Sequence, residues 1–205
     1  MKKLFSYAAG FWLVVVLILA SILVPALNPA RFEQAVLNTV NPQAVGMSES
    51  DLTAFARETM AYLRADQDAW TPVTPFVIPQ SFADHMAEVR GWVDVLKIAL
   101  PLAALLAAAG LWLGRDFRAA RSGMLCMLGL MAAVLLWAVV DFNSLWMVIH
   151  RVLIPGGIFP AGEPVMQLFP LKLFFGYLPA VIGSLMVWMA VLYAGMKLLT
   201  NKYAA

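Results

Sequence analysis

The chain contains two histidines, His85 and His150, and these are the side chains best suited to chemistry near neutral pH. An imidazole titrates close to neutrality and therefore acts as a general base or acid. One histidine of a pair can take a proton from a nucleophile while the other polarises a carbonyl or stabilises an oxyanion. The alternative is that each is an ordinary side chain making one hydrogen bond, and the residues alone leave both interpretations open.

Carboxylates near His85 are candidates for orienting its ring. Glu88 follows His85 by three residues, so a helix places the two side chains on one face. For Glu88, a solvated position or a link to Arg90 is an equally good interpretation. Asp84 is better explained as a helix cap than as a catalytic group.

Near His150, an aspartate, an arginine and two glycines could support the chemistry. Asp141 lies at a predicted membrane boundary, where an unpaired carboxylate is costly, so we expect it to pair with Arg151 or Lys172. Gly156 and Gly157 offer backbone N–H groups for an oxyanion hole, and Arg151 is a second possible donor. A simple turn is the alternative interpretation of the glycines.

Metal, cofactor and nucleic-acid chemistry are not favoured. His85, Glu88 and His150 are ligand types that suit zinc, but the chain has no third histidine, and its single cysteine, Cys126, lies within an apolar run. No phosphate-binding loop, dinucleotide fingerprint or long basic run is present. We therefore expect no metal, no soluble cofactor and no nucleic-acid partner.

The composition places these residues in a membrane protein. Apolar residues make up 62% of the chain, and the mean hydropathy is +0.81, whereas soluble domains are about 45–50% apolar. Four runs approach or reach the roughly 17–25 residues that span a bilayer as a helix. The first, preceded by Lys2 and Lys3, is longer than a signal-peptide core, so we interpret it as an uncleaved anchor.

We therefore predict an all-α integral membrane protein with four transmembrane helices. A small, mainly helical extracytoplasmic domain separates the first two spans, and a re-entrant or interfacial loop separates the last two. The predicted parts are the amino tail and first span (1–30), the extracytoplasmic domain (31–91), the second span (92–113), a cytoplasmic loop (114–121), the third span (122–141), an extracytoplasmic loop (142–172), the fourth span (173–196) and a cytoplasmic tail (197–205).

Basic residues set the expected orientation. Both tails and the 114–121 loop together hold seven basic residues and one acid, whereas the other side holds seven basic residues and eleven acids. The positive-inside rule therefore places both termini in the cytoplasm of a bacterial cell, with the protein in its cytoplasmic membrane. Counting back from Leu113 puts the outer membrane edge near Trp92, and His85 about two turns, roughly 10 Å, beyond it. Both histidines then lie at the outer face, at headgroup depth.

Local signals predict three helices outside the spans. Ser48 and Asp51 form a capping box for an amphipathic helix that reaches about residue 66. Ser81, with Asp84 at the third helical position, begins a helix that runs on into the second span. A short helix over 145–153, capped by Asn143 or Ser144, carries His150.

Two stretches have a specific resemblance. Phe82-Ala-Asp-His-Met-Ala-Glu-Val-Arg90 resembles a motif of the form H-M-x-D-V-K. The segment Phe142-Asn-Ser-Leu-Trp-Met-Val-Ile-His150, with Gln167-Leu-Phe-Pro170 and Phe174-Phe175 after it, resembles F-D-x-L-F-x-x-F-H … L-I-x-L-F-P-x-x-F-F. Both motifs, in this topology, are similar to those of the bacterial four-span family of lipoprotein intramolecular transacylases.

The resemblance implies an enzyme that acts on lipoproteins carrying a diacylglyceryl-cysteine. It would move the sn-2 acyl chain to the cysteine α-amino group and leave a lyso-form lipoprotein, with His85 and His150 as the catalytic pair. Membrane lipid and the lipoprotein are then the partners, and we expect a monomer, although the sequence does not fix the oligomeric state.

The chain departs from the family pattern at five positions. Glu88 and Arg90 replace Asp and Lys, which keeps the charge, whereas Ile149, Leu153 and Ile154 stand where the family has aromatic residues. The last three affect the expected shape of an acyl pocket.

Two other functions remain open from the sequence. One is a lipid esterase on the same scaffold. The other is a non-enzymatic accessory or regulatory subunit that binds a partner through the helical face of Leu52, Phe55, Thr59 and Leu63. A channel or transporter is disfavoured, because the first, third and fourth spans lack the acidic and basic residues that line transport paths.

Overall fold

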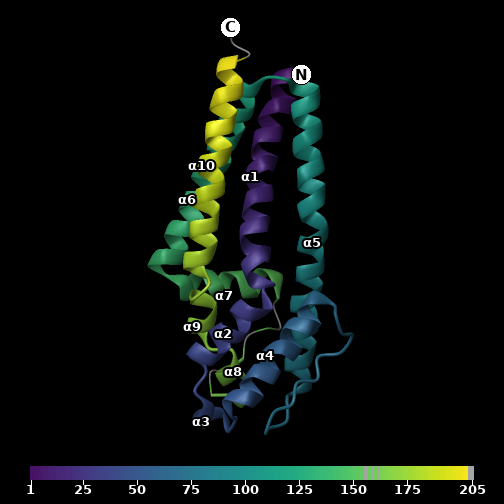
Figure 1. Cartoon of the computed structure of the whole chain (residues 1–205), viewed down its shortest axis with the longest axis vertical. Coiled ribbons are helices and arrows are strands. Elements are labelled where there is room, and N and C mark those ends of the chain that lie inside the picture. Colours follow the sequence, from purple (N-terminus) through teal and green to yellow (C-terminus); the bar gives the residue numbers. More distant parts are fainter. Residues whose placement is uncertain (155–156, 158, 161, 203–205) are drawn as a thin grey trace. The chain divides into compact units, whose positions relative to one another are not determined.

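The computed structural model describes residues 1–154, 157, 159–160 and 162–202, and they form helices and connections without a strand. Figure 1 shows the elements in order. They are α1 (Lys2–Ala26), α2 (Pro29–Thr39), α3 (Pro42–Val45), α4 (Glu49–Arg64), α5 (Gln80–Gly114), α6 (Phe117–Val140), α7 (Phe142–Leu153), α8 (Pro164–Leu168), α9 (Leu171–Phe175) and α10 (Leu178–Lys202). The all-α prediction is confirmed.

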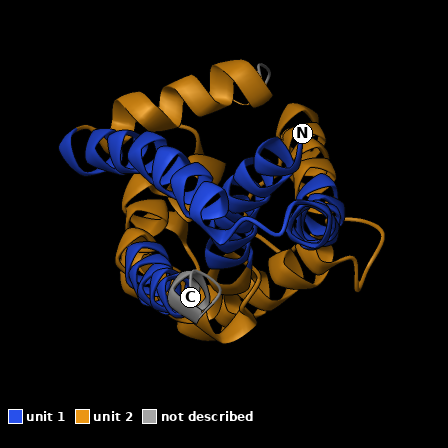
Figure 2. Cartoon of the chain, turned by 90° about the horizontal axis from the view of Figure 1, so that it is seen from above, with its two compact units in different colours: residues 1–23, 95–140, 180–205 blue, residues 24–94, 141–179 orange. Residues whose placement is uncertain are grey.

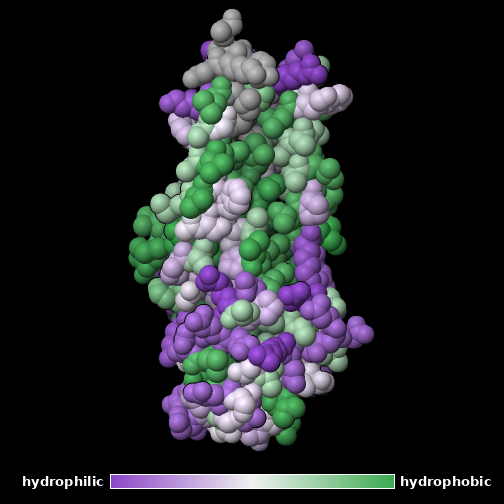
Figure 3. All heavy atoms as spheres, viewed as in Figure 1, coloured by the Kyte–Doolittle hydropathy of each residue, from purple (hydrophilic) through white to green (hydrophobic). Residues whose placement is uncertain are grey.

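The described residues contain four stretches long and apolar enough to cross a membrane, as predicted. They are Lys2–Ala26, Gln80–Gly114, Phe117–Val140 and Pro164–Gly195, the last comprising α8, α9 and most of α10. Large apolar side chains on these helices are exposed, and Figure 3 shows hydrophobic residues covering them. Such surface is suited to lipid rather than water.

The chain divides into two compact units, coloured separately in Figure 2. Unit 1 comprises residues 1–23, 95–140 and 180–205, which carry most of the long apolar helices. Unit 2 comprises residues 24–94 and 141–179, which carry both histidines. Each unit is described separately below.

Within unit 1, small residues let two helices approach closely. A Cβ at Gly10 of α1 would overlap the carbonyl of Ala120, and a Cβ at Gly123 of α6 would overlap the carbonyl of Tyr7. Hydrocarbon offers no hydrophobic drive for helices to associate, so close van der Waals contact between backbones matters more there. Glycine is therefore required at these two positions.

Within unit 2, α4 is the centre of a hydrophobic core. Leu52, Phe55 and Thr59 are fully buried, and the Trp70 indole N–H donates to the Thr59 hydroxyl at 3.1 Å. The capping box is present as predicted, with Asp51 N–H donating to Ser48 Oγ and Ser48 N–H donating to the Asp51 carboxylate. The apolar face of α4 thus packs inside its own unit.

Helix α5 runs unbroken from the extracytoplasmic sequence into the second apolar stretch, as predicted, but its start differs. The helix begins at Gln80, so Ser81 is already helical and does not act as the N-cap. The Asp84 carboxylate accepts a hydrogen bond from the Gln80 side chain at 2.8 Å instead. A proline at position 79 ends the extended segment before it, and its carbonyl accepts the N–H of Phe82.

The cap of α7 also differs from the prediction. The helix starts at Phe142, with Asp141 as N-cap, and the Asp141 carboxylate accepts the N–H of Ser144 at 2.9 Å. Asn143 and Ser144 are therefore inside the helix. A carboxylate at a helix N-terminus is stabilised by the unpaired N–H groups there, so Asp141 needs no basic partner to be accommodated.

We predict that Gly123→Ala destabilises the protein, whereas Gly129→Ala on the same helix does not. The new methyl at 123 meets a backbone carbonyl that cannot move aside, and such overpacking costs about 1–3 kcal/mol. No atom lies within 4 Å of a Cβ at Gly129. Thermal unfolding of both variants in detergent checks this, and equal midpoints would contradict the close approach.

Candidate functional site

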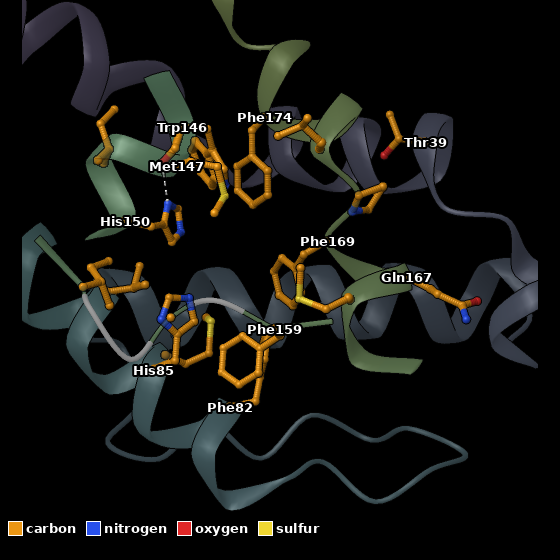
Figure 4. A pocket seen from close by; sticks show the side chains of 18 of the residues that line it. Thr39, Phe82, His85, Trp146, Met147, His150, Phe159, Gln167, Phe169 and Phe174 are labelled. Atoms are coloured by element: carbon orange, nitrogen blue, oxygen red, sulfur yellow. Dashed lines mark hydrogen bonds between the residues drawn. The ribbon is translucent and has the colours of Figure 1, made fainter. Parts of the chain in front are cut away.

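Unit 2 brings the two histidines face to face. His85 lies near the start of α5 and His150 near the end of α7, and their ring centroids are 5.9 Å apart (Figure 4). Both are buried, at 9% and 8% relative exposure. The fold therefore brings the two predicted catalytic histidines together at one buried place.

The orientation of His150 is fixed by its own helix. Nδ1 of His150 lies 3.0 Å from the carbonyl oxygen of Trp146, one turn earlier, and the two rings pack at 4.4 Å. A carbonyl oxygen only accepts, so Nδ1 carries the hydrogen of this bond. In the neutral ring Nε2 is then the acceptor, which is the state a general base requires.

His85 lies in an aromatic environment without a charged partner. Its ring contacts Phe82 and Phe159, with centroids 5.6 and 5.5 Å away, and its Nδ1 is buried with no hydrogen-bond partner among the described residues. His85 lies in the first two turns of α5, before the part of that helix that has no charged residue, 98–114. Burial, and then the nearby His150, lower the pKa of His85 from 6.5 to about 4. The ring is therefore neutral at pH 7.

Gly157 packs directly on His85. A Cβ at Gly157 would overlap Cε1 and Nδ1 of the His85 ring. The N–H of Gly157 donates to the carbonyl of Ile154 at 2.9 Å, so it is already used in a turn. Gly157 thus leaves space for the imidazole ring. Because its N–H is used in the turn, the structure does not support the hypothesis that this N–H forms an oxyanion hole. Gly156, the other glycine of that hypothesis, lies outside the described residues.

The histidines line a cavity of about 800 Å³ whose wall is mostly apolar. Its walls come from α2, α5 and α7, from described residues between Ile154 and Phe174, and from single residues of α3 and α4, Ala44 and Leu63. Figure 4 shows Thr39 and Gln167 on the side away from the histidines. Aromatic and sulfur-containing side chains make up much of the lining, among them Phe82, Met86, Trp146, Met147, Phe159, Phe169 and Phe174. A cavity of this size and polarity suits an acyl chain better than a polar substrate.

Hydrogen bonds hold the walls of the cavity together. Trp92 of α5 donates its indole N–H to the carbonyl of Leu153 at 2.8 Å, which ties the helix of His85 to the end of the helix of His150. Arg90 donates to the carbonyl of Gln67 at 2.8 Å and lies over the Tyr62 ring at 4.8 Å. Arg90 therefore anchors the segment before α5 and does not face the cavity.

The structure does not bring the other predicted supporting residues to the histidines. Glu88 and Arg151 are exposed, and neither is among the described residues that line the cavity. Asp141 caps α7 instead of facing His150. A helical face covers a wide arc, so three-residue spacing from His85 did not ensure that Glu88 shares its cavity.

Sequence reasoning missed part of the cavity wall. Phe169 and Phe174 belong to the motif quoted above, but Phe159, whose ring lies 5.5 Å from that of His85, follows a glycine- and proline-rich segment without periodicity. Asn143 also lines the cavity, although the sequence suggested it only as a cap.

The described residues contain no group of three or more metal-ligating side chains. The aromatic and apolar surroundings of the two histidines also provide no carboxylate to complete a zinc site.

Comparisons with known proteins identify a matching family and solved structures of similar fold. The sequence profile of the family described as lipoprotein intramolecular transacylase Lit matches residues 7–175. Curated protein sequences give no significant match. A solved structure of the membrane integral lipoprotein intramolecular transacylase Lit from Bacillus cereus superposes with a TM-score of 0.74 at 15% identity, covering 99% of this chain and 96% of that one.

Two further solved structures are mutants of the same Bacillus cereus protein. The H85R mutant and the H85A mutant, in that protein's numbering, each have a TM-score of 0.70 and 15% identity. They cover 99% of this chain, and 92% and 94% of their own chains respectively. At this identity the likeness establishes a shared fold.

We expect Gly157→Ala to displace His85, because its methyl would occupy the position of the ring. The displaced imidazole should react faster with diethylpyrocarbonate, measured at His85 by peptide mass spectrometry. Gly162→Ala is the matched control, since no atom lies within 4 Å of a Cβ there. An unchanged rate at His85 in a folded Gly157→Ala variant would show that the contact is not as described.

Proposed function

The chain belongs to the lipoprotein intramolecular transacylase family, and from this premise we propose that it transfers an acyl chain within a lipoprotein. The donor is the sn-2 ester of a diacylglyceryl-cysteine, and the acceptor is the α-amino group of the same cysteine. The product is an N-acyl, S-monoacylglyceryl lipoprotein, the lyso form.

One observation carries the proposal. Two buried histidine rings, 5.9 Å apart, form part of the wall of an apolar cavity of about 800 Å³. The cavity accommodates hydrocarbon, and the histidines supply the proton transfers that acyl transfer needs. A soluble cofactor is unnecessary, because ester and amine belong to one substrate and arrive already close together.

We assign His150 as the general base. Its Nδ1–H is held by the Trp146 carbonyl, so Nε2 is free to remove a proton from the substrate ammonium group. The amine then attacks the sn-2 carbonyl carbon and forms a tetrahedral oxyanion. Collapse breaks the bond to the sn-2 oxygen, and that oxygen takes the proton from His150. The attacking nitrogen loses its second proton to water as the amide forms, so the overall reaction releases one proton.

His85 fits the complementary role of electrophile. Its lowered pKa keeps it neutral, and a neutral imidazole N–H is a hydrogen-bond donor to a developing oxyanion. The uncharged surroundings make such a bond stronger than it would be in water. We propose that the site opens to the outer face of the cytoplasmic membrane, with both termini in the cytoplasm, and that one chain suffices.

The structure argues against an accessory subunit but is compatible with a lipid esterase, the two alternative functions left open by the sequence. An accessory subunit binding through α4 would need a free apolar face, but Leu52, Phe55 and Thr59 are buried in the core of unit 2. A lipid esterase uses the same histidines and cavity, and it differs in releasing fatty acid to water. The product therefore separates esterase from transacylase.

We predict that His85→Ala and His150→Ala each lower product formation at least about 100-fold, because each removes a proton-transfer or oxyanion-binding group. The chain is co-expressed with a diacylglyceryl lipoprotein in a host lacking other sources of the product, and the lipoprotein amino terminus is analysed by mass spectrometry. Glu88→Gln and Arg151→Gln, at exposed positions away from the cavity, should retain activity.

Three results would count against the proposal. Free fatty acid without an N-acylated peptide indicates an esterase. An unaltered diacylglyceryl peptide beside well-expressed wild-type protein argues against catalysis on this substrate. Full activity in either folded histidine variant excludes that residue from the mechanism.

A further inference from the structure

Unit 2 contains a second, smaller cavity whose lining is more polar. It has a volume of about 210 Å³ and lies between α2 and the segment that ends α9. Its lining consists of Arg31, Gln34, Ala35, Asn38, Thr39, Leu173, Gly176 and Tyr177. Because drug-sized ligands need about 300–1,000 Å³, this space suits a small polar group.

The polar lining is rich in hydrogen-bond donors and carries a positive charge. Arg31, Gln34 and Asn38 follow one another along one face of α2 at helical spacing. The neighbouring acid on α2, Glu33, is held by Arg57 at 3.0 Å and does not line the cavity. No acidic side chain is among the described lining residues, so the charge of Arg31 is not neutralised there.

Two of these donors have no protein partner. The Tyr177 hydroxyl is buried without a hydrogen-bond partner among the described residues. Within the same part of the chain, the Arg31 side chain forms no ion pair or hydrogen bond with another residue. A buried hydroxyl that is unsatisfied costs free energy, which a bound acceptor would recover.

The cavity lies next to the ends of two apolar helices. Arg31 follows the last residue of α1 by five positions. Tyr177 belongs to the apolar stretch Pro164–Gly195 and immediately precedes α10, the long helix of that stretch. Residues so close to the ends of membrane spans lie at the depth of lipid headgroups. Phosphate groups are the abundant anions at that depth, and arginine binds them through paired hydrogen bonds.

We propose that this cavity binds the phosphate of a membrane phospholipid headgroup, with Arg31, Gln34, Asn38 and Tyr177 as donors. The acyl chains of that lipid remain outside, because the cavity is too small for them. Thr39 lines both this cavity and the larger one that holds the histidines. The phospholipid is therefore an immediate neighbour of the proposed lipoprotein substrate.

The test measures lipid binding by the full-length chain, purified in detergent and stripped of lipid, using native mass spectrometry. Phosphatidylglycerol is compared with diacylglycerol of the same acyl chains, which lacks the phosphate, and with inorganic phosphate. Wild type should bind phosphatidylglycerol at least about tenfold more tightly than diacylglycerol, as expected for charge-assisted hydrogen bonds. Arg31→Gln and Tyr177→Phe should each remove most of this preference.

Two matched controls separate site binding from general effects. Arg64→Gln removes a positive charge from α4, and Tyr62→Phe removes a hydroxyl beside another arginine, Arg90. Both should bind phosphatidylglycerol as wild type does, and all variants should keep the wild-type thermal midpoint.

Three outcomes would overturn the inference. Equal affinity for the two lipids shows that phosphate is not recognised. Unchanged binding in both site variants places the lipid elsewhere. Inorganic phosphate binding as tightly as phosphatidylglycerol assigns the cavity to a free anion. None of these measurements involves turnover, so their failure is distinct from failure of the transacylase proposal.

Discussion

Hydrocarbon offers no hydrogen-bond partner to a polypeptide backbone, and the rest of this structure depends on that constraint. The long apolar stretches satisfy their own N–H and C=O groups as helices, and their polar side chains are few. In unit 1, close approach at Gly10 and Gly123 replaces the hydrophobic drive that lipid cannot supply. Chemistry therefore has to be built from the segments between the spans.

Those segments form unit 2, which gives the histidines the conditions that water would deny them. Aromatic rings around His85 exclude solvent and keep the imidazole neutral, and the Trp146 carbonyl selects one tautomer of His150. The two imidazoles lie with their ring centroids 5.9 Å apart. The low-polarity wall that lowers the pKa of His85 is also suited to an acyl chain.

Sequence reasoning was most accurate for interactions between residues that are close together in the chain. The Ser48–Asp51 capping box involves residues three apart, and its prediction is confirmed. The cap predictions at Ser81 and at Asn143 or Ser144 were wrong by two or three residues, because neighbouring polar residues can each cap a helix. Asp141 showed the same ambiguity, since a carboxylate suits either a cap or an ion pair.

By itself, the sequence determined the helical class, the number of apolar stretches, the two histidines as candidates and the resemblance that their motifs carry. All of these depend on local composition and spacing. Only the tertiary structure decided that His85 and His150 face each other, that Glu88 and Arg151 lie outside the cavity and that Gly157 makes room for a ring. These contacts join residues up to 72 positions apart, such as Gly157 and His85, and no local periodicity encodes which side chains such packing brings together.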